Sequence, residues 1–214
     1  MFRFGGDTQI GMSTNTLRPK RIIIGVTGSV ATVKLLALID CIKSNFSDEE
    51  TEIKIVATSS AVNFVKCLDM KSIEVFTDSQ EWHDWKKISD PILHIDLRNW
   101  ADVIVVAPLS ANTLAKMANG LCDNLLVFLS VFNIKTCIIR AWDRTKPIII
   151  CPAMNTHMYN HPITNIHLDT IKSFNYEKCI IVSPISKKLA CGDVGMGAMA
   201  EVTEIVEVLN HILE

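Results

Sequence analysis

Five apolar runs along the chain have the length and residue types of strands that are buried on both faces of a sheet. They cover residues 22–26, 53–57, 102–107, 147–151 and 179–182. The stretches between them show helical spacing of apolar residues. In the stretch that follows the first run, the residues that fall mainly on one helical face are Val33, Leu36, Ala37, Asp40 and Cys41. Strands that alternate with helices predict an α/β fold, with a parallel sheet flanked by helices on both faces.

Polar side chains stand at the ends of four of these predicted strands, in residues 27–29, 58–60, 108–113 and 152–155. The carboxyl ends of parallel strands share one edge of the sheet, and ligands of such folds bind beyond that edge. The four clusters therefore predict a common binding rim in a Rossmann-like (flavodoxin-like) domain.

We expect a single domain over residues 21–214, because the sequence shows no internal repeat, low-complexity tract or linker. Residues 1–20 lack periodicity and predict a disordered tail. The tail has no apolar stretch of the kind that marks a secretory signal. It is basic and poor in acidic residues, so a mitochondrial targeting role is a minor alternative.

The composition fits a folded protein with a large core, since 49% of the 214 residues are hydrophobic and 21% are charged. A net charge of -2 supplies no global positive field for nucleic acid or an anionic membrane. Apolar stretches such as residues 125–129 fall far short of the roughly 20 residues that span a bilayer. Seven scattered cysteines without a CxxC pair argue against disulfides and a zinc site. We therefore expect no metal and a reduced, cytoplasmic location.

The turn Gly25-Val-Thr-Gly28-Ser29 lies between the first strand and its helix, where unpaired backbone N–H groups favour an anion. A plain tight turn explains the same residues equally well. The pattern is not GxGxxG, and no acidic residue is clearly placed for the ribose of a dinucleotide. A mononucleotide phosphate is therefore the better functional interpretation.

Three other polar positions have both a structural and a functional interpretation. Ser110 and Asn155 precede helical runs, so each fits a helix N-cap as well as a ligand contact. His94 lies in an alternating segment that predicts an extended strand, with His94, Asp96 and Arg98 on one face. A lone histidine is more often structural, but histidine is also suited to acid–base chemistry near neutral pH.

Residues 187–197 begin with two lysines and contain three glycines in the six residues that follow Cys191. This composition predicts a mobile flap with an exposed thiol. Buried cysteines are usually inert, whereas a thiol in a polar, glycine-rich loop is accessible for chemistry.

Eight motifs, taken together and in this order, carry a resemblance that covers roughly residues 21–213. They are Gly28-Ser29-Val-Ala31, His94-Ile-Asp96-Leu-Arg98, Trp100-Ala-Asp102, Ala107-Pro-Leu-Ser110-Ala-Asn112-Thr113, Cys122-Asp123-Asn124-Leu-Leu126, Arg140-Ala-Trp142-Asp143, Pro152-Ala-Met-Asn155 and Ala190-Cys191-Gly192-Asp193. The sequence resembles the phosphopantothenoylcysteine decarboxylases, within the family of homo-oligomeric flavin-containing cysteine decarboxylases. It looks nearest to their eukaryotic, single-function form.

The resemblance implies FMN-dependent decarboxylation of 4'-phospho-N-pantothenoylcysteine to 4'-phosphopantetheine, a step of coenzyme A biosynthesis. The need for a flavin follows from the chemistry. Direct loss of CO2 would leave a carbanion without delocalisation, whereas oxidation of the CH2–SH group to a thioaldehyde provides an electron sink. Decarboxylation then gives an enethiol, which the reduced flavin and a proton donor must reduce.

The resemblance also implies roles for individual residues. His94 and Cys191 are catalytic, with Cys191 as the proton donor of the final reduction. The positions that hold FMN are Gly28, Ser29, Val30, Thr58, Ser60, Ser110, Ala111, Asn112, Thr113 and Met154. The positions that contact the substrate are Asn155, Met158, Lys188 and Ala190. Family members are homotrimers with active sites between subunits, so a partner is expected to supply His94.

Two features depart from the family pattern. Tyr159 stands where the motif PxMNxxMW ends in tryptophan, a replacement that keeps an aromatic ring. About nine residues, 127–135, are inserted between the Cys122 and Arg140 motifs. A helical insertion would rotate the Arg140 motif out of register unless a loop absorbs the extra length.

Three related functions are alternatives. A regulatory flavoprotein of the family binds FMN and inhibits a phosphatase, but such proteins usually carry long acidic tails. A peptidyl-cysteine decarboxylase stops at the enethiol and has no use for Cys191. A prenyl-FMN synthase shares the Gly-Ser turn but lacks the His94 and Cys191 pair.

Overall fold

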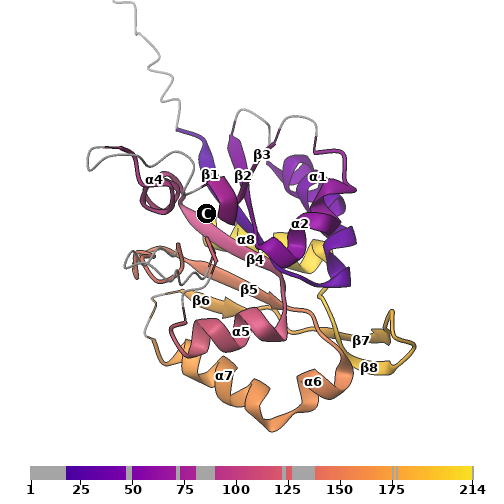
Figure 1. Ribbon diagram of the computed structural model, residues 1–214. Helices are drawn as coiled ribbons and strands as arrows, with labels where there is room; N and C mark the ends of the chain where they lie inside the picture. Colours follow the sequence, from indigo (N-terminus) through magenta and orange to yellow (C-terminus); the bar gives the residue numbers. More distant parts are fainter. Residues whose placement is uncertain are drawn as a thin grey trace, which may run out of the picture.

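A computed structural model describes residues 18–46, 50–70, 73–80, 90–121, 124–126, 138–174, 176 and 178–213. Its centre is a six-stranded sheet in the order β3-β2-β1-β4-β5-β6, and all neighbouring strands are parallel. The strands are β1 (Lys20–Val26), β2 (Thr51–Ala57), β3 (Glu74–Thr77), β4 (Val103–Leu109), β5 (Ile148–Pro152) and β6 (Cys179–Ile181). The sequence of strands confirms the predicted parallel α/β sheet (Figure 1).

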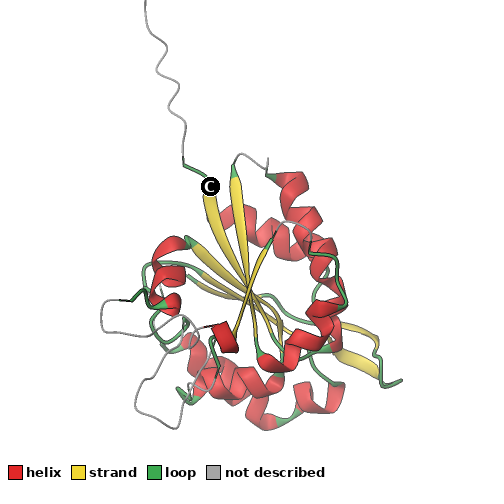
Figure 2. Ribbon diagram, turned by 45° about the horizontal axis from the view of Figure 1, so that its top comes forward, coloured by secondary structure: helices red, strands yellow, loops and turns green. Residues whose placement is uncertain are grey.

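Helices cover both faces of the sheet, as predicted (Figure 2). One face packs against α1 (Leu35–Asn45), α2 (Ser59–Lys66) and α8 (Val202–Leu213). The other packs against α4 (Leu93–Trp100), α5 (Ala111–Ala118) and α7 (Pro162–Lys172). Successive residues of β1 enter opposite cores, since Ile22 and Ile24 belong to the first and Ile23 to the second, which is why this strand is a continuous apolar run.

The edge strand β3 was not among the predicted strands. Its four residues include only two large apolar side chains, Val75 and Phe76, and none of the four is buried. An edge strand this short leaves too little of an apolar run to be distinguished from a loop.

The residues expected to share one helical face after the first strand are not the residues that pack into the core. A short 3-10 helix, η1 (Val30–Lys34), precedes α1, and α1 buries Leu35, Leu38, Ile39 and Ile42. Val33, from the predicted face, is 65% exposed. Leu36, Ala37, Asp40 and Cys41 do share one face of α1, but it is the face opposite to the buried one.

The predicted extended segment around His94 is also wrong, because these residues form α4. His94 and Leu97 lie three residues apart and are both buried in α4, whereas Asp96 is exposed. Residues two apart point to opposite sides of a helix, so His94 and Asp96 do not share a face. Over eight residues, the apolar positions satisfied both a strand and a helix pattern.

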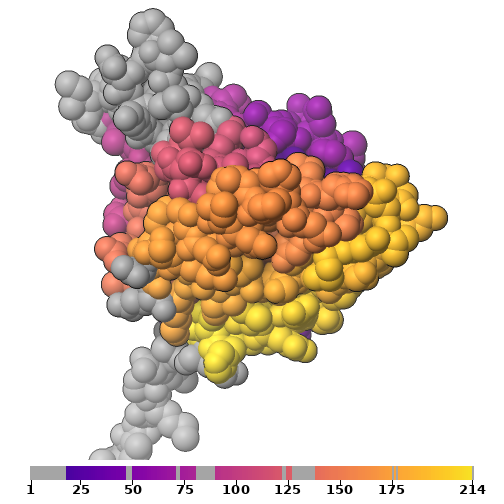
Figure 3. Space-filling model, turned by 90° about the horizontal axis from the view of Figure 1, so that it is seen from below, coloured from indigo at the N-terminus to yellow at the C-terminus, as the bar shows by residue number. Residues whose placement is uncertain are grey.

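Outside the main sheet, β7 (Ile185–Lys188) and β8 (Val194–Ala198) form an antiparallel hairpin. It contains most of the predicted flap. The hairpin projects at the side of the molecule opposite α4 in Figure 1 and reaches past α6 (Thr156–Asn160) and α7 in the space-filling view of Figure 3.

The predicted tail falls mostly outside the described residues, but its last residues do not. Lys20 is already part of β1, and the Arg18 guanidinium binds both carboxylate oxygens of Asp102 at 2.7 and 3.0 Å. None of the described helices combines the length and apolarity that crossing a membrane requires.

The inserted residues 127–135 lie outside the described residues, but the chain on either side of them is described. The N–H of Ile138 donates to Leu125 O at 3.2 Å, and that of Ile139 donates to Leu126 O at 3.4 Å. Asp78, the residue after β3, fixes the same point, because its carboxylate accepts the N–H of Leu125 at 2.7 Å. The two ends of the insertion therefore meet, and the register of the Arg140 motif does not depend on the extra length.

Candidate active site

A cavity of about 340 Å³ opens between the end of β1, the end of β5 and the β7–β8 hairpin. The sheet order reverses between β1 and β4, which is the place where ligands bind in doubly wound sheets. The predicted site residues that line the cavity are Ser29, Val30, Met154, Asn155, Lys188, Ala190 and Cys191. The structure thus brings together residues from three separate parts of the sequence.

The turn after β1 offers backbone donors to this region. Within the described part of the chain, no acceptor binds the N–H groups of Gly28, Ser29 and Val30. The Ser29 hydroxyl caps η1 by accepting the N–H of Ala31, and it donates to Ala153 O at 3.3 Å. This hydroxyl therefore holds the end of β1 against the end of β5 and leaves three N–H groups for an anion.

Gly28 is required at this turn by close packing. A Cβ at this position would lie 2.6 Å from the Ser60 hydroxyl oxygen. The Ser60 hydroxyl also lies 3.1 Å from that of Thr58. The predicted positions Gly28, Thr58 and Ser60 are thus neighbours on the rim, although they do not line the cavity itself.

The end of β4 is joined to the end of β1 by hydrogen bonds. The Thr27 hydroxyl donates to Pro108 O and accepts the N–H of Ser110, both at 2.7 Å. Ser110 is the N-cap of α5, because its hydroxyl accepts the N–H of Thr113 at 3.4 Å. The capping interpretation of Ser110 is therefore correct, and Ala111, Asn112 and Thr113 form the first turn of α5 on this rim.

Asn155, Cys191 and Asp193 form a hydrogen-bonded cluster at the mouth of the cavity. The Asn155 amide donates to Asp193 Oδ2 at 2.6 Å and to Cys191 Sγ at 3.1 Å. The thiol donates to the same Asp193 oxygen at 3.3 Å. The hydrogen bonds from Asn155 and Cys191 hold the pKa of Asp193 below its usual range. Asn155 also caps α6, since its Oδ1 accepts the N–H of His157 at 2.8 Å.

Close backbone packing places the hairpin against this cluster. Gly197 has φ +144°, and a Cβ on it would overlap the carbonyl oxygen of Met154. In return, the Met154 N–H donates to Gly197 O at 2.9 Å. Only glycine allows β8 to lie this close, so the position of Cys191 depends on Gly197.

Three lysines give the cavity a positive lining, namely Lys34, Lys187 and Lys188. Glu201 lies 3.0 Å from Lys34 Nζ and 3.5 Å from Lys187 Nζ, and Lys34 holds the pKa of Glu201 below its usual range. Within the described residues, Lys188 has no carboxylate partner. The lining therefore suits an anionic ligand.

The structure does not bring His94 into this cavity. His94 is 7% exposed and lies on α4, on the opposite side of the molecule from the hairpin (Figure 1). The C-terminal carbonyls of α4 are bound by the Lys146 ammonium, which donates to Arg98 O at 3.0 Å and also to Ala101 O. Burial lowers the pKa of Lys146. Met158, on α6, is 50% exposed and also lies outside the cavity lining.

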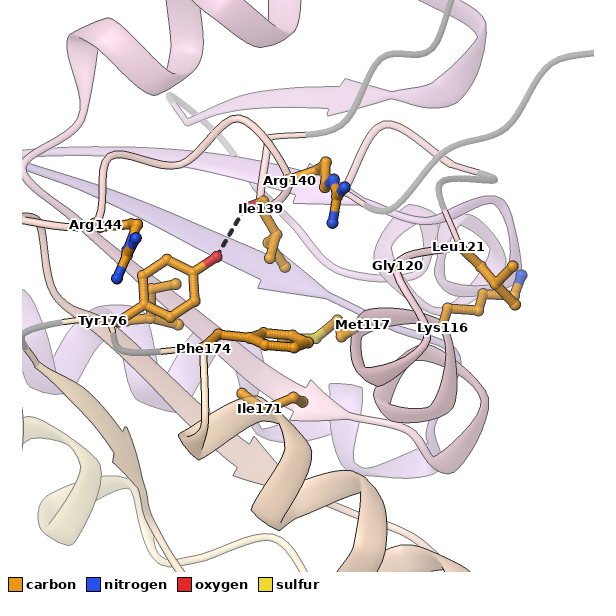
Figure 4. Close-up of a pocket in the computed structure, with 11 residues that line it drawn as sticks. Lys116, Met117, Gly120, Leu121, Ile139, Arg140, Arg144, Ile171, Phe174 and Tyr176 are labelled. Atoms are coloured by element: carbon orange, nitrogen blue, oxygen red, sulfur yellow. Dashed lines mark hydrogen bonds between the residues drawn. The ribbon is translucent and has the colours of Figure 1, made fainter.

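A second cavity, of about 180 Å³, is lined in part by Ile139, Arg140 and Arg144 (Figure 4). The rings of Phe174 and Tyr176 lie beside it, and the Tyr176 hydroxyl donates to Ile139 O at 3.3 Å. It reaches Ile148, the first residue of β5, and therefore lies away from the carboxyl ends of the strands. It contains none of the predicted site residues.

The site residues predicted from the sequence did not include Lys34, Lys187 or Asp193. Asp193 was visible in the Ala190-Cys191-Gly192-Asp193 motif, where a tight turn places residues i and i+2 of a loop close together. Lys34 gave no such signal, because it lines the cavity only through the path of η1.

Comparison with known proteins adds to this geometry. Residues 10–214 match the Flavoprotein family. A probable phosphopantothenoylcysteine decarboxylase of Arabidopsis thaliana is 48% identical over 194 residues, which are 90% of this chain and 88% of that protein. A solved cysteine-to-serine mutant of PPC decarboxylase, complexed with pantothenoylaminoethenethiol, is 43% identical, with a TM-score of 0.80 over 92% of this chain and 99% of the other. The FMN binding protein AtHal3 is 44% identical, with a TM-score of 0.75 over 91% and 96%.

Proposed function

The chain belongs to the Flavoprotein family, and we propose that it catalyses the FMN-dependent decarboxylation of 4'-phospho-N-pantothenoylcysteine to 4'-phosphopantetheine. The observation that carries this proposal is the thiol–amide–carboxylate cluster of Cys191, Asn155 and Asp193 at a cavity beside an anion-binding turn. The product serves coenzyme A biosynthesis. A reducing compartment such as the cytoplasm suits the free thiols of the described residues.

The residues at the end of β1 fit FMN. The unpaired N–H groups of Gly28, Ser29 and Val30 match the needs of a phosphate, and an apolar wall that includes Val30 and Met154 suits a flavin ring. When bound there, FMN supplies a reversible two-electron acceptor. The rim residues Thr58, Ser60 and 110–113 offer further hydroxyl and amide contacts.

The residues of the cavity have distinct tasks in the reaction. The lysines of the lining attract the phosphorylated, carboxylated substrate, and the Asn155 amide binds its carboxylate. Oxidation removes two electrons and two protons from the CH2–SH group and gives the thioaldehyde. As CO2 leaves, the electrons of the broken C–C bond move into the C=S group and give an enethiolate, which becomes the enethiol when its sulfur takes up a proton from solvent. Reduction of its C=C bond consumes two electrons and two protons, and Cys191 donates one of these protons.

We assign His94 to the same reaction through a neighbouring subunit. Because α4 and the hairpin of one chain lie on opposite sides of the molecule, one chain does not unite His94 and Cys191. A homotrimer with active sites at its interfaces would bring His94 of one subunit to the cavity of the next. Co-expression of His94→Gln and Cys191→Ser chains tests this directly. Mixed trimers should recover part of the activity that each variant lacks, whereas a site within one chain gives no recovery.

The proposed function is tested by anaerobic turnover of phosphopantothenoylcysteine with the purified protein. CO2 and the product thiol are followed together with the visible flavin spectrum. Release of both in equal amounts, with an unchanged flavin spectrum after turnover, is the expected result. FMN-loaded protein that releases no CO2 would contradict the proposal and favour the regulatory function.

A further inference from the structure

We propose that the Asp193 carboxylate is a positioning group that occupies the place of the substrate's carboxylate in the resting protein and there holds Asn155 and the Cys191 thiol in their working orientation. This inference rests on the proposed function, because it takes the substrate to be a carboxylate that binds Asn155. It adds a role for a residue that forms no part of the expected site.

One oxygen of Asp193 accepts hydrogen bonds from both donors of the cluster. Oδ2 accepts the Asn155 amide at 2.6 Å and the Cys191 thiol at 3.3 Å. Hydrogen bonds to an ionised carboxylate are shorter and stronger than those between neutral groups, so this oxygen is the centre of the cluster.

The Asn155 side chain already uses its hydrogen-bonding groups. Its amide nitrogen has two hydrogens, which point to Asp193 and to Cys191, and its Oδ1 accepts the N–H of His157. An incoming carboxylate can bind this amide only if one of the present partners leaves. Asp193 is the partner of the same charge as the substrate, so repulsion displaces Asp193 first.

Backbone hydrogen bonds in the turn of residues 189–193 direct the Asp193 side chain toward Asn155. The N–H of Leu189 donates to Asp193 O at 2.8 Å, and that of Gly192 donates to Leu189 O at 2.9 Å. Gly192 has φ +94° with open space around its Cα, so the turn is set by conformation and not by packing. Such a turn can move away from Asn155 as a unit when the substrate enters.

The displacement of Asp193 from Asn155 by the substrate carboxylate has two consequences. In the resting protein, the thiol donates its hydrogen to Asp193 Oδ2 at 3.3 Å, and this hydrogen bond fixes the position of the S–H group. When the substrate carboxylate takes the amide of Asn155, Asp193 and Cys191 move together, so the thiol reaches the substrate only after binding and keeps the orientation that Asp193 gives it. The tip of the hairpin therefore responds to a carboxylate on the ligand.

The inference is tested with Asp193→Ala and Asp193→Asn, and with Asp169→Asn as the control. Asp169 is an exposed carboxylate on α7 whose ion pair with Lys172 is unrelated to the cavity. Alkylation of Cys191 by iodoacetamide is measured by peptide mass spectrometry, with the exposed Cys67 as the internal reference. Both Asp193 variants should alkylate Cys191 about fivefold to tenfold faster than the wild type, because the thiol loses its charged acceptor.

Turnover supplies the second measurement. Asp193→Ala should lower KM for the substrate about threefold to tenfold, since no internal carboxylate competes for Asn155. It should also raise the ratio of enethiol to reduced product, because the thiol is no longer aligned. Unchanged alkylation, KM and product ratio would overturn the inference. If the wild type itself releases no CO2, the proposed function fails, and the alkylation result still decides whether Asp193 holds Cys191.

Discussion

Helix α4 and the β7–β8 hairpin each carry a residue to which we assign catalysis, but different contacts hold them. His94 is 7% exposed on α4, which packs Leu97 into the core and has its last carbonyls bound by Lys146. Cys191 is exposed at the end of the hairpin and is held by side-chain hydrogen bonds to Asn155 and Asp193. The core therefore fixes the histidine, whereas a few polar contacts fix the thiol. Changes on α4 should affect stability and activity together, and changes at the hairpin should affect activity alone.

The sharpest test of this difference is Cys191→Ser. Loss of a positioned proton donor should lower formation of the reduced product by about 100-fold to 10000-fold. CO2 release should continue and the enethiol should accumulate, while the melting temperature stays that of the wild type. Cys67→Ser, on an exposed residue, is the matched control. A lowered melting temperature in Cys191→Ser would contradict the view that the hairpin is independent of the core.

On α4, His94→Gln should lower both the rate of decarboxylation and the free energy of unfolding. Removal of the imidazole should reduce decarboxylation by about 100-fold. Because the side chain is buried, the free energy of unfolding should also fall by about 1 to 2 kcal/mol, as measured by urea denaturation. Full stability with lost activity would mean that His94 is not anchored by the core.

Lys146→Met tests the contact that holds α4 in place. Methionine keeps the apolar stem but removes the ammonium that binds Arg98 O, Asn99 O and Ala101 O, so three carbonyls lose a charged donor. The free energy of unfolding should fall by about 1 to 2 kcal/mol. Hydrogen exchange should increase at the C-terminal end of α4 and remain unchanged in the hairpin. Equal increases in both regions would contradict the view that different contacts hold α4 and the hairpin.

The smallest effect is expected at Asp102, which follows α4. Burial opposes its ionisation, but the Arg18 guanidinium and the Arg21 N–H outweigh burial and lower the pKa of Asp102. A lowered folded-state pKa adds stability that is present above the unfolded-state value of about 4 and is lost as the pH falls through the folded-state value. Asp102→Asn should cost about 0.5 to 1 kcal/mol at pH 7, since solvent screens the exposed ion pair.

This cost should disappear below about pH 4, where Asp102 becomes protonated in the unfolded and then in the folded state. Urea denaturation of the wild type and Asp102→Asn between pH 7 and pH 3 measures it. A difference that stays constant with pH would show that the carboxylate charge is not the cause.

The molecule also shows which features a sequence determines locally. The buried strands β1 and β5 were predictable because each residue faces an apolar core on one side or the other. The rim followed from them, since parallel strands place their ends together. The conformation of α4 was not predictable, because eight residues with apolar positions two and four apart satisfy both periods.

The partners of the site residues required the tertiary structure. Asp193 reaches Asn155 only because Gly197 lets β8 pack against Met154, a contact between residues over 40 positions apart. The separation of His94 from Cys191 depends on where α4 packs in the fold. No spacing along the chain carries that information.

The hydrogen bonds that join Leu125 to Ile138 and Leu126 to Ile139 have a consequence for evolution. Because these bonds hold the chain on both sides, residues can be added or removed between Leu126 and Ile138 at a small cost in the free energy of folding. Loop closure costs only about 0.6 kcal/mol for each doubling of length. A lineage can add or delete residues here while the rim that binds ligands keeps its geometry. In this protein, a stretch whose length can change therefore lies directly beside Leu125 and Leu126, whose side chains are buried in the core.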